Sequence, residues 1–259
     1  MKSFALALVL LAISTSAALA ADSPFVGTWK LNVGKSKLAG NTFTYTATAT
    51  GFQYSNGSTV KFDFATDGKD YPAFPGRTVS WTKVGDNTWD SVYKDDHGTV
   101  LSKIHRVLSP DGKTMTVTST DYHADGTTSE ETVTRARVSG GPGLAGTWKE
   151  VKVSPAADTT IISVPSAGHI KYEFPRDKQF VEGPVDGTPS RFQGQSVPEG
   201  ATVAFKQKAP NELEWSYAVK GTVMQRGVDT VSTDGKSLTS VNWVPGKESE
   251  KTVQLYDKQ

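Results

Sequence analysis

The sequence predicts an all-β protein built from two tandem antiparallel β-barrels, each with about eight strands in up-and-down order. Two observations predict this fold class. The tetrapeptide GTWK at residues 27–30 returns at residues 146–149, and much of the sequence after one copy can be aligned with the sequence after the other. Within each copy, short segments of alternating apolar and polar residues are separated by Gly-containing turns, and no stretch shows helical periodicity over three turns.

The repeat also predicts the domain boundaries. Residues 87–100 (NTWDSVYKDDHGTV) align with residues 211–223 (NELEWSYAVKGTV) after the deletion of one residue, and SPDGK at 109–113 corresponds to STDGK at 232–236. We therefore predict one barrel at residues 24–138 and a second at 144–257, each of ordinary domain size. The spacer at 139–143 (SGGPG) is rich in turn residues, which is typical of a linker between domains.

The strands of the first unit are predicted from their patterns. Residues 42–49 (TFTYTATA) alternate Phe43, Tyr45, Ala47 and Ala49 against a face of threonines, which is the period of a half-buried strand. Asn-Gly and Asp-Gly pairs between the strands suit the positive φ angles of tight hairpins. The other predicted strands are residues 28–32, 60–64, 78–84, 88–93, 99–108, 114–122 and 129–138, with turns at 56–57, 67–68, 111–112 and 125–126.

The first 20 residues have the pattern of a cleaved export signal. Lys2 supplies a positive charge, residues 4–13 are apolar, and ALA at 18–20 provides a small-x-small cleavage site. The apolar run is shorter than the ~20 residues that a membrane-spanning helix needs. We therefore expect cleavage near Ala20, export to the periplasm or the exterior, and no membrane span.

Composition excludes several classes of protein. The chain has no cysteine, so neither disulfides nor a lipidated cysteine can hold it. Without Lys2, the remaining 27 lysines and arginines balance the 27 aspartates and glutamates. This balance gives no indication of binding to nucleic acid or to an anionic membrane surface.

Two motifs carry a resemblance to a known group of barrels. Residues 25–31 (FVGTWKL) resemble the N-terminal strand of the fatty-acid-binding proteins, and Gly-x-Trp is the hallmark of the wider lipocalin and calycin group. Residues 253–258 (VQLYDK) resemble the last strand of the same family. The resemblance implies a lipocalin-like barrel that encloses a small hydrophobic ligand. The helical lid of the fatty-acid-binding proteins is missing, because only about ten residues separate Leu31 from the next strand.

The resemblance also implies roles for individual residues. In the lipocalin-like group the Gly-x-Trp tryptophan closes one end of the barrel, often covered by an arginine of the last strand. This assigns Trp29 and Trp148 to closed ends, with Arg135 or Arg137 covering Trp29. In the fatty-acid-binding proteins an Arg-x-Tyr pair on that strand binds the ligand carboxylate. The first unit has Arg135 with Arg137 at those places, and the second has Gln254 with Tyr256, so neither has the full pair.

Aromatic and arginine side chains are the candidate ligand contacts. An indole or phenol that alternates inward can line an apolar cavity, although aromatic residues on strands also serve packing alone. A guanidinium in a cavity can bind a carboxylate through two charge-assisted hydrogen bonds. The candidate ligand-binding residues are Arg135, Arg137, Trp81, Trp89, Tyr93, Trp215, Tyr217 and Tyr256.

Motifs for catalysis and metal binding are absent from the sequence. There is no Gly-x-Ser-x-Gly elbow and no His-Glu-x-x-His helix. His97 lies at a predicted hairpin tip, and His105 and His123 alone do not supply the three or four ligands that a metal site needs. We therefore predict no catalytic residue, no metal site and no cofactor, and an enzyme is the less favoured class.

Three functions remain compatible with the sequence. The first is an exported binding protein that holds small hydrophobic, lipid-like molecules in its barrel cavities. The second is a structural or protein-interaction protein of the cell envelope whose barrels are filled by side chains. The third is a cofactor-independent isomerase or cyclase, which would require an ionisable group in a desolvated place inside a barrel.

Overall fold

The computed structural model describes residues 23–38, 40–155 and 158–259, and the predicted export signal lies outside them. The described part is 64% strand and 3% helix, so the all-β prediction is confirmed. Its elements are β1 (Gly27–Leu31), η1 (Val33–Lys35), β2 (Thr42–Ala47), β3 (Phe52–Ser55), β4 (Lys61–Phe64), β5 (Asp67–Pro72), β6 (Arg77–Gly85), β7 (Thr88–Asp95), β8 (Val100–Leu108), β9 (Thr114–Tyr122), β10 (Thr128–Ser139), β11 (Gly146–Ser154), β12 (Thr159–Ser163), β13 (His169–Phe174), η2 (Pro175–Asp177), β14 (Gln179–Pro184), β15 (Asp186–Gly194), β16 (Ala201–Ala209), β17 (Glu212–Val219), β18 (Thr222–Val231), β19 (Ser237–Trp243) and β20 (Thr252–Lys258).

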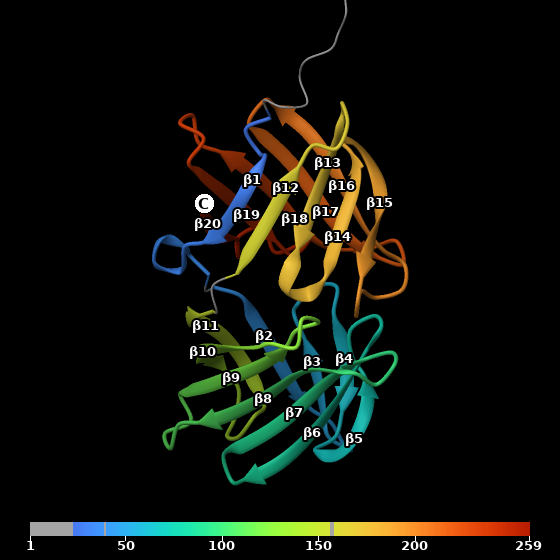
Figure 1. Ribbon diagram of the computed structural model, residues 1–259. Helices are drawn as coiled ribbons and strands as arrows, with labels where there is room; N and C mark the ends of the chain where they lie inside the picture. Colours follow the sequence, from blue (N-terminus) through green and yellow to red (C-terminus); the bar gives the residue numbers. More distant parts are fainter. Residues whose placement is uncertain (1–22, 39, 156–157) are drawn as a thin grey trace, which may run out of the picture.

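The strands form two antiparallel, barrel-like sheets of ten strands each, stacked one on the other (Figure 1). We call the sheet of β2 to β11 the first barrel; its terminal strands β4 and β5 are neighbours without a hydrogen-bonded ladder. The second barrel is closed and contains β1 and β12 to β20. Two barrel-like sheets were predicted, but with about eight strands each. In the described chain, no helix is long and apolar enough to cross a membrane.

Two strands of the first repeat, β3 and β5, were not predicted, and their sequence signals are weak. β3 is only four residues long, and β5 (DGKDYP) is almost fully exposed and consists largely of residue types that strands disfavour. Its Asp67-Gly68 pair was predicted to form a turn. Instead, Gly68 has a φ of 79° within β5, where the pairing with β6 shifts register between Asp67 and Asp70. A bulge in a terminal strand tolerates both the glycine and Pro72.

The first strands of the two repeats are exchanged between the barrels. β1, which opens the first repeat, pairs with β12 and β20 of the second barrel. β11, which opens the second repeat, pairs with β10 and β2 of the first barrel. In Figure 1 the blue strand β1 accordingly lies in the upper barrel and β11 in the lower one.

This exchange alters the predicted partition at 24–138 and 144–257. The first barrel is formed by residues 42–154, and the second by residues 27–31 together with 159–258. The spacer 139–143 belongs to the short connection between β10 and β11, so it lies within one sheet instead of joining two barrels. The chain crosses between barrels at residues 32–41 and again between β11 and β12.

The repeated tryptophans are core residues with the same local hydrogen bond. Trp29 and Trp148 are both fully buried, and each indole Nε1 donates to the carbonyl four residues earlier, that of Phe25 at 2.8 Å and that of Leu144 at 3.0 Å. Because β1 and β11 are exchanged, Trp29 packs in the core of the second barrel and Trp148 in that of the first. Each repeated tryptophan thus packs in the barrel that is formed mainly by the other repeat.

A cationic side chain covers each of the two tryptophans, but the one over Trp29 is not the predicted arginine. Arg137 lies over Trp148, with its Cζ 4.1 Å from the ring centroid, because β11 pairs with the strand that carries Arg137. Trp29 is covered instead by Lys258 of β20, whose Nζ is 5.1 Å from the ring. Neither Arg135 nor Arg137 covers Trp29, since both belong to the other barrel.

Polar side chains of the first barrel make direct contacts with the second barrel. Arg77 Nη2 donates to the Ser196 carbonyl at 2.5 Å, and Ser196 Oγ donates to Asp95 Oδ2 at 3.1 Å. On another side, His123 Nδ1 and Asp177 Oδ1 are 2.7 Å apart. These contacts connect β6, β7 and the segment after β9 to the β14 and β15 region, so the open ends of the barrels meet.

Candidate functional site

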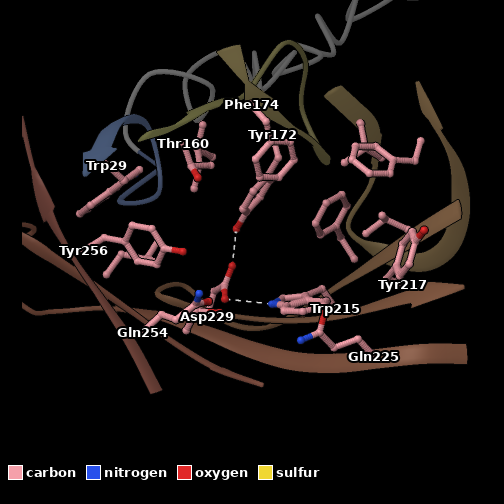
Figure 2. A pocket seen from close by; sticks show the side chains of 17 residues that line it. Trp29, Thr160, Tyr172, Phe174, Trp215, Tyr217, Gln225, Asp229, Gln254 and Tyr256 are labelled. Atoms are coloured by element: carbon pink, nitrogen blue, oxygen red, sulfur yellow. Dashed lines mark hydrogen bonds between the residues drawn. The ribbon is translucent and has the colours of Figure 1, made fainter. Parts of the chain in front are cut away.

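The second barrel encloses a cavity of about 390 Å³ whose walls are mainly aromatic and aliphatic. Figure 2 shows Trp29 and Tyr256 at one end, Tyr217 and Gln225 at the other, and Asp229 between them. The cavity is lined by Trp29, Thr160, Ile162, Tyr172, Phe174, Val181, Phe192, Val203, Phe205, Trp215, Tyr217, Gln225, Asp229, Leu238, Ser240, Gln254 and Tyr256.

Among the described residues of this wall, Asp229 of β18 is the single acidic side chain. It is 3% exposed, and both carboxylate oxygens accept hydrogen bonds: Oδ2 from the Tyr172 hydroxyl at 2.8 Å, and Oδ1 from Trp215 Nε1 at 2.9 Å. Trp215 can lie over the cross-strand residue only because that residue is Gly227. A Cβ there would be 2.3 Å from Cε2 of the indole. The sequence therefore fixes both the carboxyl and its donors on rigid strands.

Burial raises the pKa of Asp229, while hydrogen bonds from Ser240, Trp215 and Tyr172 lower it by less. The folded protein thus retains a proton on Asp229 at a pH where the unfolded chain has lost it. As pH rises from the unfolded pKa to the folded one, the folded state loses stability, and above both values the loss is complete.

We therefore expect Asp229→Asn to raise the melting temperature near pH 7. The amide has no charge to desolvate and can still accept from Trp215. The advantage should shrink as pH falls towards about 4, where the aspartate in the unfolded chain also becomes protonated. Thermal melts of both proteins across this range test the expectation. Equal melting shifts at every pH would show that the carboxyl is not held in a desolvated place.

A larger cavity of about 690 Å³ occupies the open end of the first barrel. Its walls come from β2, β3 and β6 to β11, and also from residues of the second barrel: Pro198, Tyr217, Val219, Met224, Gln225 and Val244. Its aromatic members include Tyr45, Tyr54, Phe74 and Tyr93, and burial raises the pKa of Tyr93 to about 12. This cavity is more polar than the other because its walls carry several arginines and acidic residues.

Arg135 and Glu150 form a buried ion pair on the wall of this cavity, with Nη2 of Arg135 3.7 Å from Oε1 of Glu150. Arg135 Nη1 also donates to the Tyr45 hydroxyl at 3.4 Å. Burial raises the pKa of Glu150, of Glu131 and of Asp121, and the neighbouring carboxylates raise that of Glu131 further. Arg135 is therefore already largely compensated by charge within the barrel.

Arg106 of β8 is the buried cation of this cavity without an acidic partner. It is 3% exposed; Nη1 donates to Ser91 Oγ at 2.7 Å, and the guanidinium lies 4.0 Å from the centroid of Trp81. Its Nε has no hydrogen-bond partner, and among the described residues no carboxylate forms an ion pair with it. A buried, uncompensated charge is costly, so this position favours an anionic group in the cavity.

Arg106 and Asp229 occupy equivalent positions in the two barrels. Each stands two residues before the apolar end of its strand, Leu108 or Val231, and the SPDGK and STDGK turns come immediately afterwards. Both side chains point inward, as the alternation from those buried residues requires. The two cavities thus carry a basic and an acidic side chain at matched places.

The structure brings five of the eight candidate ligand-binding residues to cavity walls. Arg135 and Tyr93 line the first cavity, Trp215 and Tyr256 line the second, and Tyr217 lines both. Trp81 and Trp89 are core residues that do not line either cavity, Trp81 being stacked on Phe64 at 4.4 Å.

Arg137 also lies away from both cavities. Its guanidinium donates to the carbonyls of Gly112, Ala145 and Gly143 at 2.6 to 2.7 Å and covers Trp148. Sequence reasoning missed Arg106 and Asp229. Alternate residues of a strand face the same side, so the buried Leu108 and Val231 indicate that Arg106 and Asp229, two positions earlier, also point inward.

Comparisons with known proteins gave no relative of this chain. A scan against protein-family models found no match, and neither did searches of curated proteins and of solved structures. The described residues contain no group of three or more metal-ligating side chains placed to hold a metal ion.

Proposed function

We propose that this chain is an exported binding protein that holds a small hydrophobic, lipid-like molecule with an acidic group in its lipocalin-like barrels. The observation that carries the proposal is Arg106, a buried cation without a counter-charge at the wall of a large, partly aromatic cavity. Ligand sites are typically concave and mostly apolar, with a few polar groups that fix orientation. The leader-like residues 1–20 support export.

The structural alternative, in which the barrels are filled by side chains, is less well supported. Aromatic residues do meet across parts of both cores, as Tyr172 and Phe205 do at 5.0 Å between ring centroids. Even so, cavities of about 390 and 690 Å³ remain beside these contacts. Drug-sized ligands occupy pockets of roughly 300 to 1,000 Å³, so both are large enough.

Arg106→Met tests the proposal directly. We expect the variant to weaken binding of a long-chain carboxylate such as hexadecanoic acid by about 2 kcal/mol, roughly 30-fold, because a buried charge-assisted hydrogen bond is lost. Isothermal titration calorimetry of the mature protein measures the change. The matched control is Lys103→Met, which removes the same charge from the exposed face of the same strand.

The outcome against the proposal is specific. Equal affinities for the parent, R106M and K103M proteins would exclude recognition of the acid by Arg106. Organic extraction of protein recovered from a bacterial periplasm, with mass spectrometry of the extract, should in addition identify a co-purifying acidic amphiphile. Its absence, together with no binding of added acids, would favour the structural function.

A cofactor-independent isomerase or cyclase is supported by one observation, the desolvated carboxyl of Asp229 inside a barrel. An ionisable group in such a place is what that function requires. However, both oxygens of Asp229 accept hydrogen bonds from the protein, and the neighbouring Tyr172 and Tyr256 have pKa values raised by burial. The wall thus lacks a second group that exchanges protons near neutral pH, and binding remains the better supported function.

A further inference from the structure

The two cavities meet at a shared wall. Tyr217 of β17 and Gln225 of β18 are cross-strand partners, and both line both cavities. Figure 2 shows these two side chains together at the end of the second cavity that is farthest from Trp29. We call Tyr217 and Gln225 the junction pair.

The two cavities lie on either side of the junction pair. Trp29 lines the second cavity at the end away from this pair, as Figure 2 shows. The first cavity is completed by second-barrel residues such as Pro198 and Val244 and would be open to solvent without them. A molecule too long for either barrel would extend from one cavity into the other by displacing the junction pair.

We propose that the chain binds one elongated acidic amphiphile across both barrels, with its carboxylate at Arg106 and its hydrocarbon tail beyond the junction pair in the second barrel. The proposal rests on the function proposed above and adds the length, the orientation and the stoichiometry of the ligand.

Charge sets the orientation. The first cavity holds the uncompensated Arg106, whereas the second is walled by aromatic and aliphatic side chains around Asp229. An anionic head group placed in the second cavity would lose its hydration beside a carboxyl and would gain no cation. A hydrocarbon tail placed there contacts Phe205, Trp215 and Leu238 and needs no polar partner.

Photo-crosslinking locates the tail. Hexadecanoic acid with a diazirine at its methyl end should label peptides of residues 159–258, and octanoic acid with the same group should label peptides of residues 42–154. Native mass spectrometry should show one hexadecanoate for each chain. The inference is overturned if the long probe labels only the first barrel, or if two long acids bind one chain.

Gln225→Trp tests the passage itself, because the larger indole would thicken the wall that the two cavities share at the junction pair. Affinity in the parent should rise about fourfold for each methylene added beyond octanoate, as the tail enters apolar surroundings. In Q225W this rise should stop, so that hexadecanoate loses its advantage over octanoate in the same variant. The control Arg226→Trp places the same side chain at the next, exposed position and should behave like the parent.

The outcomes separate the two proposals. If acids of every length bind through Arg106, as R106M would reveal, but the rise with length is the same in Q225W and R226W, the spanning ligand is excluded and the binding function stands. If R106M has no effect or neither acid binds, both proposals fail together.

Discussion

Trp148→Ala should destabilise the first barrel, although Trp148 belongs to the second sequence repeat. The indole is fully buried, donates to the Leu144 carbonyl and lies under Arg137. Truncation of a buried tryptophan leaves a cavity and typically costs about 3 to 5 kcal/mol. Because β11 pairs with β10 and β2, the lost packing lies entirely within the first barrel.

Hydrogen exchange measured by mass spectrometry resolves which barrel responds. In W148A, peptides of β2 to β10 should lose protection, while those of β12 to β20 stay close to the parent. Trp29→Ala provides the mirrored control and should affect the second barrel, where Trp29 packs with Phe25 and Leu238. Loss of protection according to repeat, with W29A weakening β2 to β10, would contradict the strand exchange.

The strand exchange marks the limit of what the repeat could predict. Residues 27–30 and 146–149 are identical, so each strand has the same pairing chemistry for either barrel, and sequence similarity alone cannot choose between them. The lengths of the connections favour one pairing over the other. The short turn-rich segment between Ser139 and Gly146 favours a hairpin of β10 with β11, whereas the longer connection at residues 32–41 allows β1 to reach the other barrel. The spacer SGGPG suits a linker and a hairpin equally.

The candidate site was predictable only in part for a related reason. Aromatic residues such as Tyr93, Trp215 and Tyr217 could be proposed because large apolar side chains on strands line barrel interiors. Charged residues are expected outside, so Arg106 and Asp229 carried no signal by type. Their inward direction is indicated only by a buried residue two positions further along the same strand. This inference requires that the strand extends that far. The shared wall at Tyr217 depends on how the barrels stack, which local sequence patterns do not encode.

Arg137→Met should separate a structural role of this arginine from the ligand contact that the sequence suggested. The guanidinium donates hydrogen bonds to three backbone carbonyls. That of Gly112 lies between β8 and β9, and those of Gly143 and Ala145 lie between β10 and β11. Methionine retains much of the apolar packing on Trp148 but leaves the three acceptors without their donor. Bonds to a charged donor contribute roughly 1.5 to 3 kcal/mol each, and partial access of these carbonyls to water reduces the loss, so we expect a destabilisation of about 3 kcal/mol.

Two measurements on the same variant decide the matter. Urea unfolding should show the lower stability, and calorimetry at a temperature where the variant is folded should show hexadecanoate affinity within about twofold of the parent, since Arg137 does not line either cavity. Arg137→Lys keeps the charge but cannot present the planar fork of donors, so it should recover only a small part of the stability. A large loss of affinity in R137M without a loss of stability would return Arg137 to the binding site and would require β10 to turn it inward.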